Sequence, residues 1–330
     1  LEGMTAASDE GFVFTGVLDG EGGARLLEVD QLAVQQEKGR VEWVHLDITK
    51  EPARQWLHDQ PDLPELAVEG LLAPDTEPRY AELDDGILLI LREVNTHENA
   101  DPHDMISLRL WIGPARIISA RLRHLAAIED IKVALAKKSG PGSVSEFLCA
   151  VGRNMAKEKA EILAGVIEDL DEIDEDLAQA DDTKTLRPRI AKLRRRAIQL
   201  HRFFRPQRAA FADIAERRPA WVDDSAADEL AELSAEFGRL AADIEAILGR
   251  AQVTQDELRS LENQRATDIT TTLTVVAAIF LPLGFVTGLL GINVGGIPLA
   301  ESKAGFWVTS GALLALGIAL WLYFRNRRYL

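Results

Sequence analysis

The chain has 330 residues, of which 53 are acidic and 37 are lysine or arginine, so its formal net charge at pH 7 is -16. A surface this acidic repels phosphate backbones, which argues against a nucleic acid as partner. The single cysteine, Cys149, excludes an intramolecular disulfide and any Cys-x-x-Cys metal or redox motif. The residues after position 268 carry a net charge of +3, so the acidity belongs to the polar part that precedes them.

Residues 1–140 are predicted to form an α/β domain in the cytoplasm. Short runs rich in β-branched and aromatic residues indicate strands, and helical patterns lie between them. We expect strands at 12–18, 41–48, 79–83, 87–94, 106–112 and 116–120, and helices at 51–58, 63–72 and 122–137.

A polar segment between two of these strands reads His-Glu-Asn-Ala-Asp-Pro-His-Asp. Imidazole and carboxylate groups are ligands that zinc accepts, so this segment is a candidate metal site. The spacing does not fix a tetrahedron, and an ordinary polar hairpin loop is the alternative. The candidate ligands are His97, Asp101, His103 and Asp104.

Residues 141–225 are predicted to form a cytoplasmic helical hairpin. Two long amphipathic helices are expected at 143–181 and 187–217. The first carries a block of aspartate and glutamate, and the second a block of arginine and lysine. Ion pairing between antiparallel helices is one interpretation, and a surface that accumulates cations or gates a pore is the other.

A heptad pattern of apolar residues runs through 226–268, which predicts a stalk helix. No proline interrupts this segment, so the stalk is expected to continue into the membrane as one helix of about 65 residues and roughly 95 Å. Such a rod cannot bury its seam alone and needs partner helices from the same chain or from other subunits.

Two apolar runs predict transmembrane helices at 269–290 and 306–325. The loop 291–305 carries one acid and one base, whereas the tail 326–330 and its flank are basic. The positive-inside rule therefore places both termini in the cytoplasm and the loop outside. Two buried core helices of a soluble protein are the alternative.

Polar and small residues form a stripe along the first span at helical spacing. This stripe can line a pore, or it can let neighbouring helices pack closely. The span contains no His, Cys, Asp or Glu, so a passing ion would keep much of its water and meet hydroxyl and carbonyl oxygens. The stripe consists of Thr267, Thr270, Thr274, Leu281, Gly284 and Gly288.

Enzyme motifs are missing from the sequence. No glycine-rich phosphate loop follows a strand, and neither Gly-x-Ser-x-Gly nor His-Glu-x-x-His occurs. An enzyme is therefore not expected, and neither is a cofactor.

The tripeptide Gly291-Ile292-Asn293 follows a proline-containing apolar helix and precedes a short loop and a C-terminal span. This arrangement resembles the CorA superfamily of metal-ion transporters, whose marker at this place is Gly-Met-Asn. The continuation Val-Gly-Gly-Ile-Pro and the Asn-Gln-Arg before the first span look more like the zinc-transporting ZntB branch.

The resemblance implies an α+β membrane protein of the bacterial inner membrane, with the loop 291–305 in the periplasm. It implies a homopentameric funnel in the lipid bilayer, with five first spans around the pore. It places Asn293 at the outer mouth, where five amides could hold a hydrated cation, and Gly291 at a tight turn. Isoleucine at 292 replaces the family's methionine, and the acid of the loop, Glu301, comes late. Zinc, with Cd2+, Ni2+ and Co2+, is therefore the expected cargo.

Two alternatives remain open. One is a Mg2+ or Co2+ channel of the same superfamily. The other is a membrane-tethered metal sensor that does not transport. The resemblance to the zinc branch implies uptake driven by a proton gradient. The spans hold no titratable carboxylate or histidine, so the sequence does not itself show this coupling.

Overall fold

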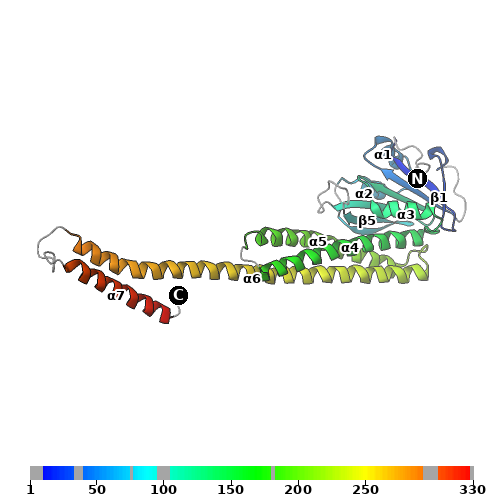
Figure 1. Ribbon diagram of the computed structural model, residues 1–330. Coiled ribbons are helices and arrows are strands. Elements are labelled where there is room, and N and C mark those ends of the chain that lie inside the picture. The colour runs from blue at the N-terminus through cyan, green and yellow to red at the C-terminus, as the bar shows by residue number, and fades with distance from the viewer. Residues whose placement is uncertain are drawn as a thin grey trace. The chain divides into compact units, whose positions relative to one another are not determined.

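The computed structural model describes residues 10–32, 40–74, 77–94, 105–179, 183–292 and 304–327 (Figure 1). The chain consists of two compact units. The first contains residues 1–180 and 184–252, and the second contains residues 181–183 and 253–330.

A seven-stranded mixed sheet forms the centre of the first unit, in the order β2-β1-β3-β7-β6-β5-β4. The neighbours β3 and β7 pair in parallel, and every other described pair is antiparallel. The strands are β1 (Phe12–Leu18), β2 (Ala24–Leu26), β3 (Val41–Asp47), β4 (Arg79–Leu83), β5 (Gly86–Val94), β6 (Met105–Ile112) and β7 (Arg116–Arg121).

Helices cover both faces of this sheet. Val44 and Leu46 of β3 join a buried core with α1 (Glu51–His58) and α2 (Glu65–Leu72). Because side chains alternate along a strand, Trp43 and His45 project to the other face. There the Trp43 ring lies 4.9 Å from Phe147 of α4 (Val144–Gln179). The helix α3 (Ala126–Ala136) packs against α4.

The helices α4 and α5 (Leu186–Arg217) and the first part of α6 (Asp224–Leu290) form a bundle. Side-chain contacts join Cys149 to Ala226 and Arg250 to Asp174, so α4 and α6 run parallel. The apolar seam of the stalk is buried in this unit by helices of the same chain. Its buried members are Leu230, Leu233, Phe237, Leu240, Ile244, Ile247 and Ala251.

Ion pairs join the acidic block of α4 to the basic block of α5. Arg189 binds Glu172 and Asp176, and Arg196 binds Asp169 at 3.3 Å, which shows that the two helices are antiparallel. The pairing interpretation of these charged blocks is thereby confirmed. The acidic partner in each pair is more than half exposed, so each pair contributes little to stability.

The second unit holds the apolar end of α6 and the helix α7 (Gly305–Asn326), orange and red in Figure 1. Both helices are long and apolar enough to cross a membrane. Only 6% of the most apolar window of each is buried, which separates them from the core helices of a soluble domain. The expected continuity of stalk and span is confirmed, since α6 runs from Asp224 to Leu290 as one helix of 67 residues.

Some predicted bounds were wrong. The three-residue edge strand β2 and the short 3-10 helix Val29–Gln31 were not predicted, because such short elements show no periodicity. The helix expected at 122–137 begins only at Ala126. The predicted strand 41–48 ends at Asp47, and the strand 116–120 extends to Arg121.

Candidate cation pathway

The hydroxyl stripe of the first span consists of Thr267, Thr270 and Thr274, which are all exposed in the single chain. Each hydroxyl donates to a backbone carbonyl one turn earlier, at 2.9 Å to Asn263, 2.8 Å to Ala266 and 2.7 Å to Thr270. A threonine hydroxyl has one hydrogen and two lone pairs, so this bond uses its hydrogen. The stripe therefore presents oxygen lone pairs outward, which suits the water shell of a cation.

A different face of α6 lies against α7. Val275 is only 3% exposed, and a side-chain carbon on Gly317 of α7 would lie 3.6 Å from Leu283. On the stripe, by contrast, Leu281 is 70% exposed. A side-chain carbon at Gly284 or Gly288 would meet nothing within 4 Å. The part of the predicted pore face at Leu281, Gly284 and Gly288 is thus left uncovered by the chain's own second span.

The stripe borders a groove near the N-terminal end of the span. Tyr323 and Phe324 of α7 line this groove together with Asn263 and the threonines of the stripe. The threonine end of the stripe therefore lies beside the C-terminal end of α7, across this groove.

The first span ends at the predicted tripeptide. The Gly291 amide donates to the carbonyls of Thr287 and Gly288, at 3.0 and 3.1 Å. Gly291 does not have a positive φ, but a side-chain carbon there would lie 3.2 Å from the Thr287 oxygen. The close approach, not a left-handed conformation, explains the glycine. Ile292 is 46% exposed.

Several predicted site residues lie outside the described residues. These are Asn293 and Glu301 in the loop between the spans, and the candidate ligands His97, Asp101, His103 and Asp104. Within the ranges that the structure does describe, no three His, Cys, Asp or Glu side chains come together in a way that could hold a metal ion.

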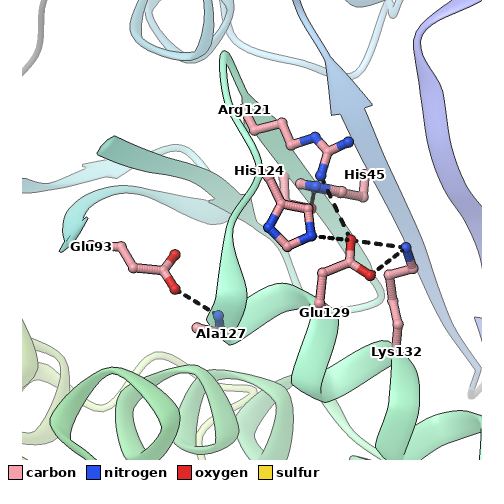
Figure 2. A network of polar contacts seen from close by, with 8 residues as sticks. His45, Glu93, Arg121, His124, Ala127, Glu129 and Lys132 are labelled. Carbon is pink, nitrogen blue, oxygen red and sulfur yellow. Dashed lines mark hydrogen bonds and ion pairs between the residues drawn. The ribbon is translucent and has the colours of Figure 1, made fainter. Parts of the chain in front are cut away.

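A polar network lies at the end of the parallel strands β3 and β7 (Figure 2). Glu129 of α3 is approached by Lys132 at 3.0 Å, by Arg121 at 3.6 Å and by His124 at 3.7 Å. His45 is fully buried beside this network, and its Nδ1 lies 2.8 Å from the Ser119 hydroxyl. Burial, with Arg121 and Lys132 nearby, holds the pKa of His45 well below its usual value, so the imidazole is neutral.

A second group of buried charges was missed at the sequence level. Glu93 of β5 and Lys159 of α4 are completely buried, and Glu158 lies beside them. Helical spacing could have predicted that Lys159 is buried. Lys159 lies four residues after Met155 and four before Leu163, both of which are buried, so it belongs to the apolar face of α4. A lysine in an apolar stripe is unusual and points to a charged partner.

The comparisons with known proteins agree with this architecture. The family described as CorA-like Mg2+ transporter protein matches residues 38–328. The chain belongs to this CorA-like family. The CorA-like chain is 33% identical to the divalent cation transporter CmaX of Pseudomonas aeruginosa over 335 residues, covering 100% of both. It is 30% identical to the zinc transport protein ZntB of Yersinia enterocolitica over 312 residues, covering 94% of both.

Solved structures extend the likeness to the fold of the CorA-like chain. The full-length CmaX protein superimposes with a TM-score of 0.84 at 32% identity, covering 98% of this chain and 100% of CmaX. The CorA magnesium transporter of Methanocaldococcus jannaschii gives a TM-score of 0.82 at 19% identity, covering 96% of this chain and 98% of CorA. The sheet domain, the long helix and the two C-terminal candidate spans are therefore those of the CorA fold.

Proposed function

We propose that this protein transports divalent cations, zinc before others, across a bacterial inner membrane. Membership of the CorA-like family and full-length likeness to CmaX and ZntB support transport over enzymatic activity. The observation that carries the proposal is the exposed stripe of Thr267, Thr270 and Thr274, whose hydroxyl hydrogens are all used within the helix.

The chemistry of the stripe suits a hydrated ion. From Ile269 to Leu290 the first span has no charged side chain, no histidine and no cysteine. Threonine lone pairs can accept hydrogen bonds from the water around an ion, but they cannot replace the whole shell. The ion would therefore pass with most of its water, and Asn293 would bind that water at the outer mouth.

A pore requires several copies of the uncovered face. We infer a homopentamer in which five first spans surround the pathway and the second spans contact lipid. The described basic residues after the second span stack on its aromatic rings, with Arg325 5.0 Å from the centre of Trp321 and Arg327 5.9 Å from that of Tyr323. Basic residues beside a span are typical of the cytoplasmic side, which supports a topology with both termini inside.

The choice of zinc rests on the likeness to ZntB, on Ile292 in place of methionine and on the late Glu301. A magnesium or cobalt channel is the second candidate, favoured by the family's description. A competition assay in proteoliposomes separates the two. With zinc as cargo, excess Mg2+ or hexaamminecobalt leaves 65Zn2+ uptake within about twofold, whereas with a magnesium pathway both compete strongly.

A membrane-tethered sensor without transport is tested by the number of subunits. Mass measurement of the detergent-solubilised protein should give five copies. A monomer or dimer would exclude a pore that several first spans surround and would favour the sensor.

A further inference from the structure

Three ionisable side chains lie buried between the sheet and the helix α4. Glu93 and Lys159 have no exposed surface, and both carboxylate oxygens of Glu158 are buried as well. Within the described chain, the Lys159 ammonium, the Glu93 Oε2 and both Glu158 oxygens have no hydrogen-bond partner. Groups of this kind cost free energy when buried, so their retention calls for an explanation.

The group touches four elements of the first unit. Figure 2 shows the Glu93 carboxylate directed at the start of α3, where its Oε1 accepts a hydrogen bond of 2.6 Å from the Ala127 amide. Asn154 of α4 donates to the carbonyl of the same Ala127 at 3.1 Å. The Lys159 ammonium lies 5.7 Å from the ring centre of Phe237 on α6. A change of charge at this group therefore acts on the contacts of α3 and α4 with the sheet.

The charges of the group do not balance. Two carboxylates face one ammonium, and Asp130 of α3 and Glu161 of α4 add further negative potential. Burial raises the pKa of Glu93 to about 7 and that of Glu158 to about 8, while it lowers the pKa of Lys159 to about 8. One additional proton makes the group neutral, and it is taken up near physiological pH.

We propose that Glu93, Glu158 and Lys159 form a proton-binding site through which the proton concentration around this domain changes the packing of α4 and α3 against β5. When ionised, Glu93 is a strong acceptor for the Ala127 amide and is favoured by the N-terminal end of the α3 dipole. When it is protonated, that bond weakens and the neutral group packs without charge. This site stands independently of which metal the protein transports.

The test uses the full-length protein in detergent and the variants Glu93→Gln and Glu158→Gln. The glutamine oxygen at 93 can still accept from Ala127, so the variant removes the titration and keeps the contact. Glu168→Gln, on the exposed side of α4, is the matched control. Thermal unfolding of each protein is followed from pH 6 to pH 8.5.

A carboxyl group whose pKa is raised by folding stabilises the protein below its unfolded pKa, and this contribution is lost as the pH rises through the folded pKa. The Tm of each cluster variant should therefore rise relative to wild type by roughly 5 °C between pH 6 and pH 8.5. The control should run parallel to wild type. If the curves of Tm against pH for Glu93→Gln and Glu158→Gln both ran parallel to that of wild type, the proposed proton site would be overturned.

Amide exchange in residues 126–129, corrected for the intrinsic effect of pH, tests the packing change. Protection in wild type should differ between pH 6 and pH 8.5 and should not differ in Glu93→Gln. Equal protection at both pH values in wild type would overturn the coupling to α3, whatever the Tm profiles show.

Discussion

The guanidinium of Arg250 on α6 binds one carboxylate oxygen of Asp174 on α4 through two nitrogens, at 2.6 and 2.8 Å. A further nitrogen reaches Asp171 at 2.6 Å. This fork joins two parallel helices in the middle of the acidic block. Since Arg250 is about half exposed, the variant Arg250→Ala should lower the free energy of unfolding by only about 1 kcal/mol.

Urea denaturation of the purified protein measures this loss. Arg259→Ala is the control. The ion pair that the described structure shows for Arg259 is with Asp256, one turn earlier on the same helix, and both side chains are more than half exposed. The control should change stability by less than 0.5 kcal/mol or so. A loss of about 3 kcal/mol at Arg250 would show that the fork is a buried pair in the assembled protein.

Two glycines of α4 should respond to alanine in opposite directions. A side-chain carbon at Gly152 would lie 2.6 Å from Leu233 and 3.2 Å from Phe211, both of which are buried. Gly152→Ala should therefore destabilise the protein by about 1–3 kcal/mol through overpacking. At Gly165 a carbon would meet nothing within 4 Å, so Gly165→Ala should stabilise by about 0.5–1 kcal/mol. Equal effects in a denaturation experiment would contradict the close approach of α4 and α6.

The buried imidazole of His45 should make the protein sensitive to acid. Its pKa is well below the usual value in the folded state, so protonation of the unfolded chain below about pH 6.5 removes stability as the pH falls. The advantage of wild type over His45→Asn should shrink by up to about 1.4 kcal/mol per pH unit below pH 6.5. His58→Asn, at an exposed position, should follow wild type throughout. If the free energies of unfolding of wild type and His45→Asn changed with pH in parallel, the imidazole would be able to ionise in the folded protein.

The hydroxyl stripe can be tested with two isosteric variants on opposite sides of the first span. Thr270→Val removes a lone-pair group from the exposed stripe and should lower cation flux about tenfold, an effect on the order of 1.4 kcal/mol in the barrier. Thr272 makes the same bond to its own helix, 2.9 Å to the Asp268 carbonyl, but points away from the stripe. Thr272→Val should keep flux within about twofold. A larger loss of cation flux in Thr272→Val than in Thr270→Val would place the pathway on another face of α6.

Periodicity was enough to predict the elements that carry the fold. The heptads before residue 268 and the charge-free run after it predicted one long helix, and α6 is that helix. Runs rich in β-branched and aromatic residues predicted the long strands, including β3. These signals are local, because each depends on residues within one or two turns.

Contacts between distant residues could not be predicted in this way. The start of α3 depends on Glu93, 34 residues earlier in the chain, and the sequence around Ala127 shows no sign of it. The parallel pairing of β3 with β7 joins segments separated by more than 70 residues. For the site, the spacing of the threonines predicted the stripe. The roles of Asn293 and of the loop from His97 to Asp104 stay predictions.

Reconstituted transport tests the central claim most directly. Purified protein in liposomes with a fluorescent zinc indicator inside should show saturable zinc entry well above that of empty liposomes. Asn293→Ala should reduce this entry at least tenfold, while the protein still assembles as a pentamer. Zinc entry no faster than in empty liposomes, with the wild-type protein folded and assembled, would contradict the account.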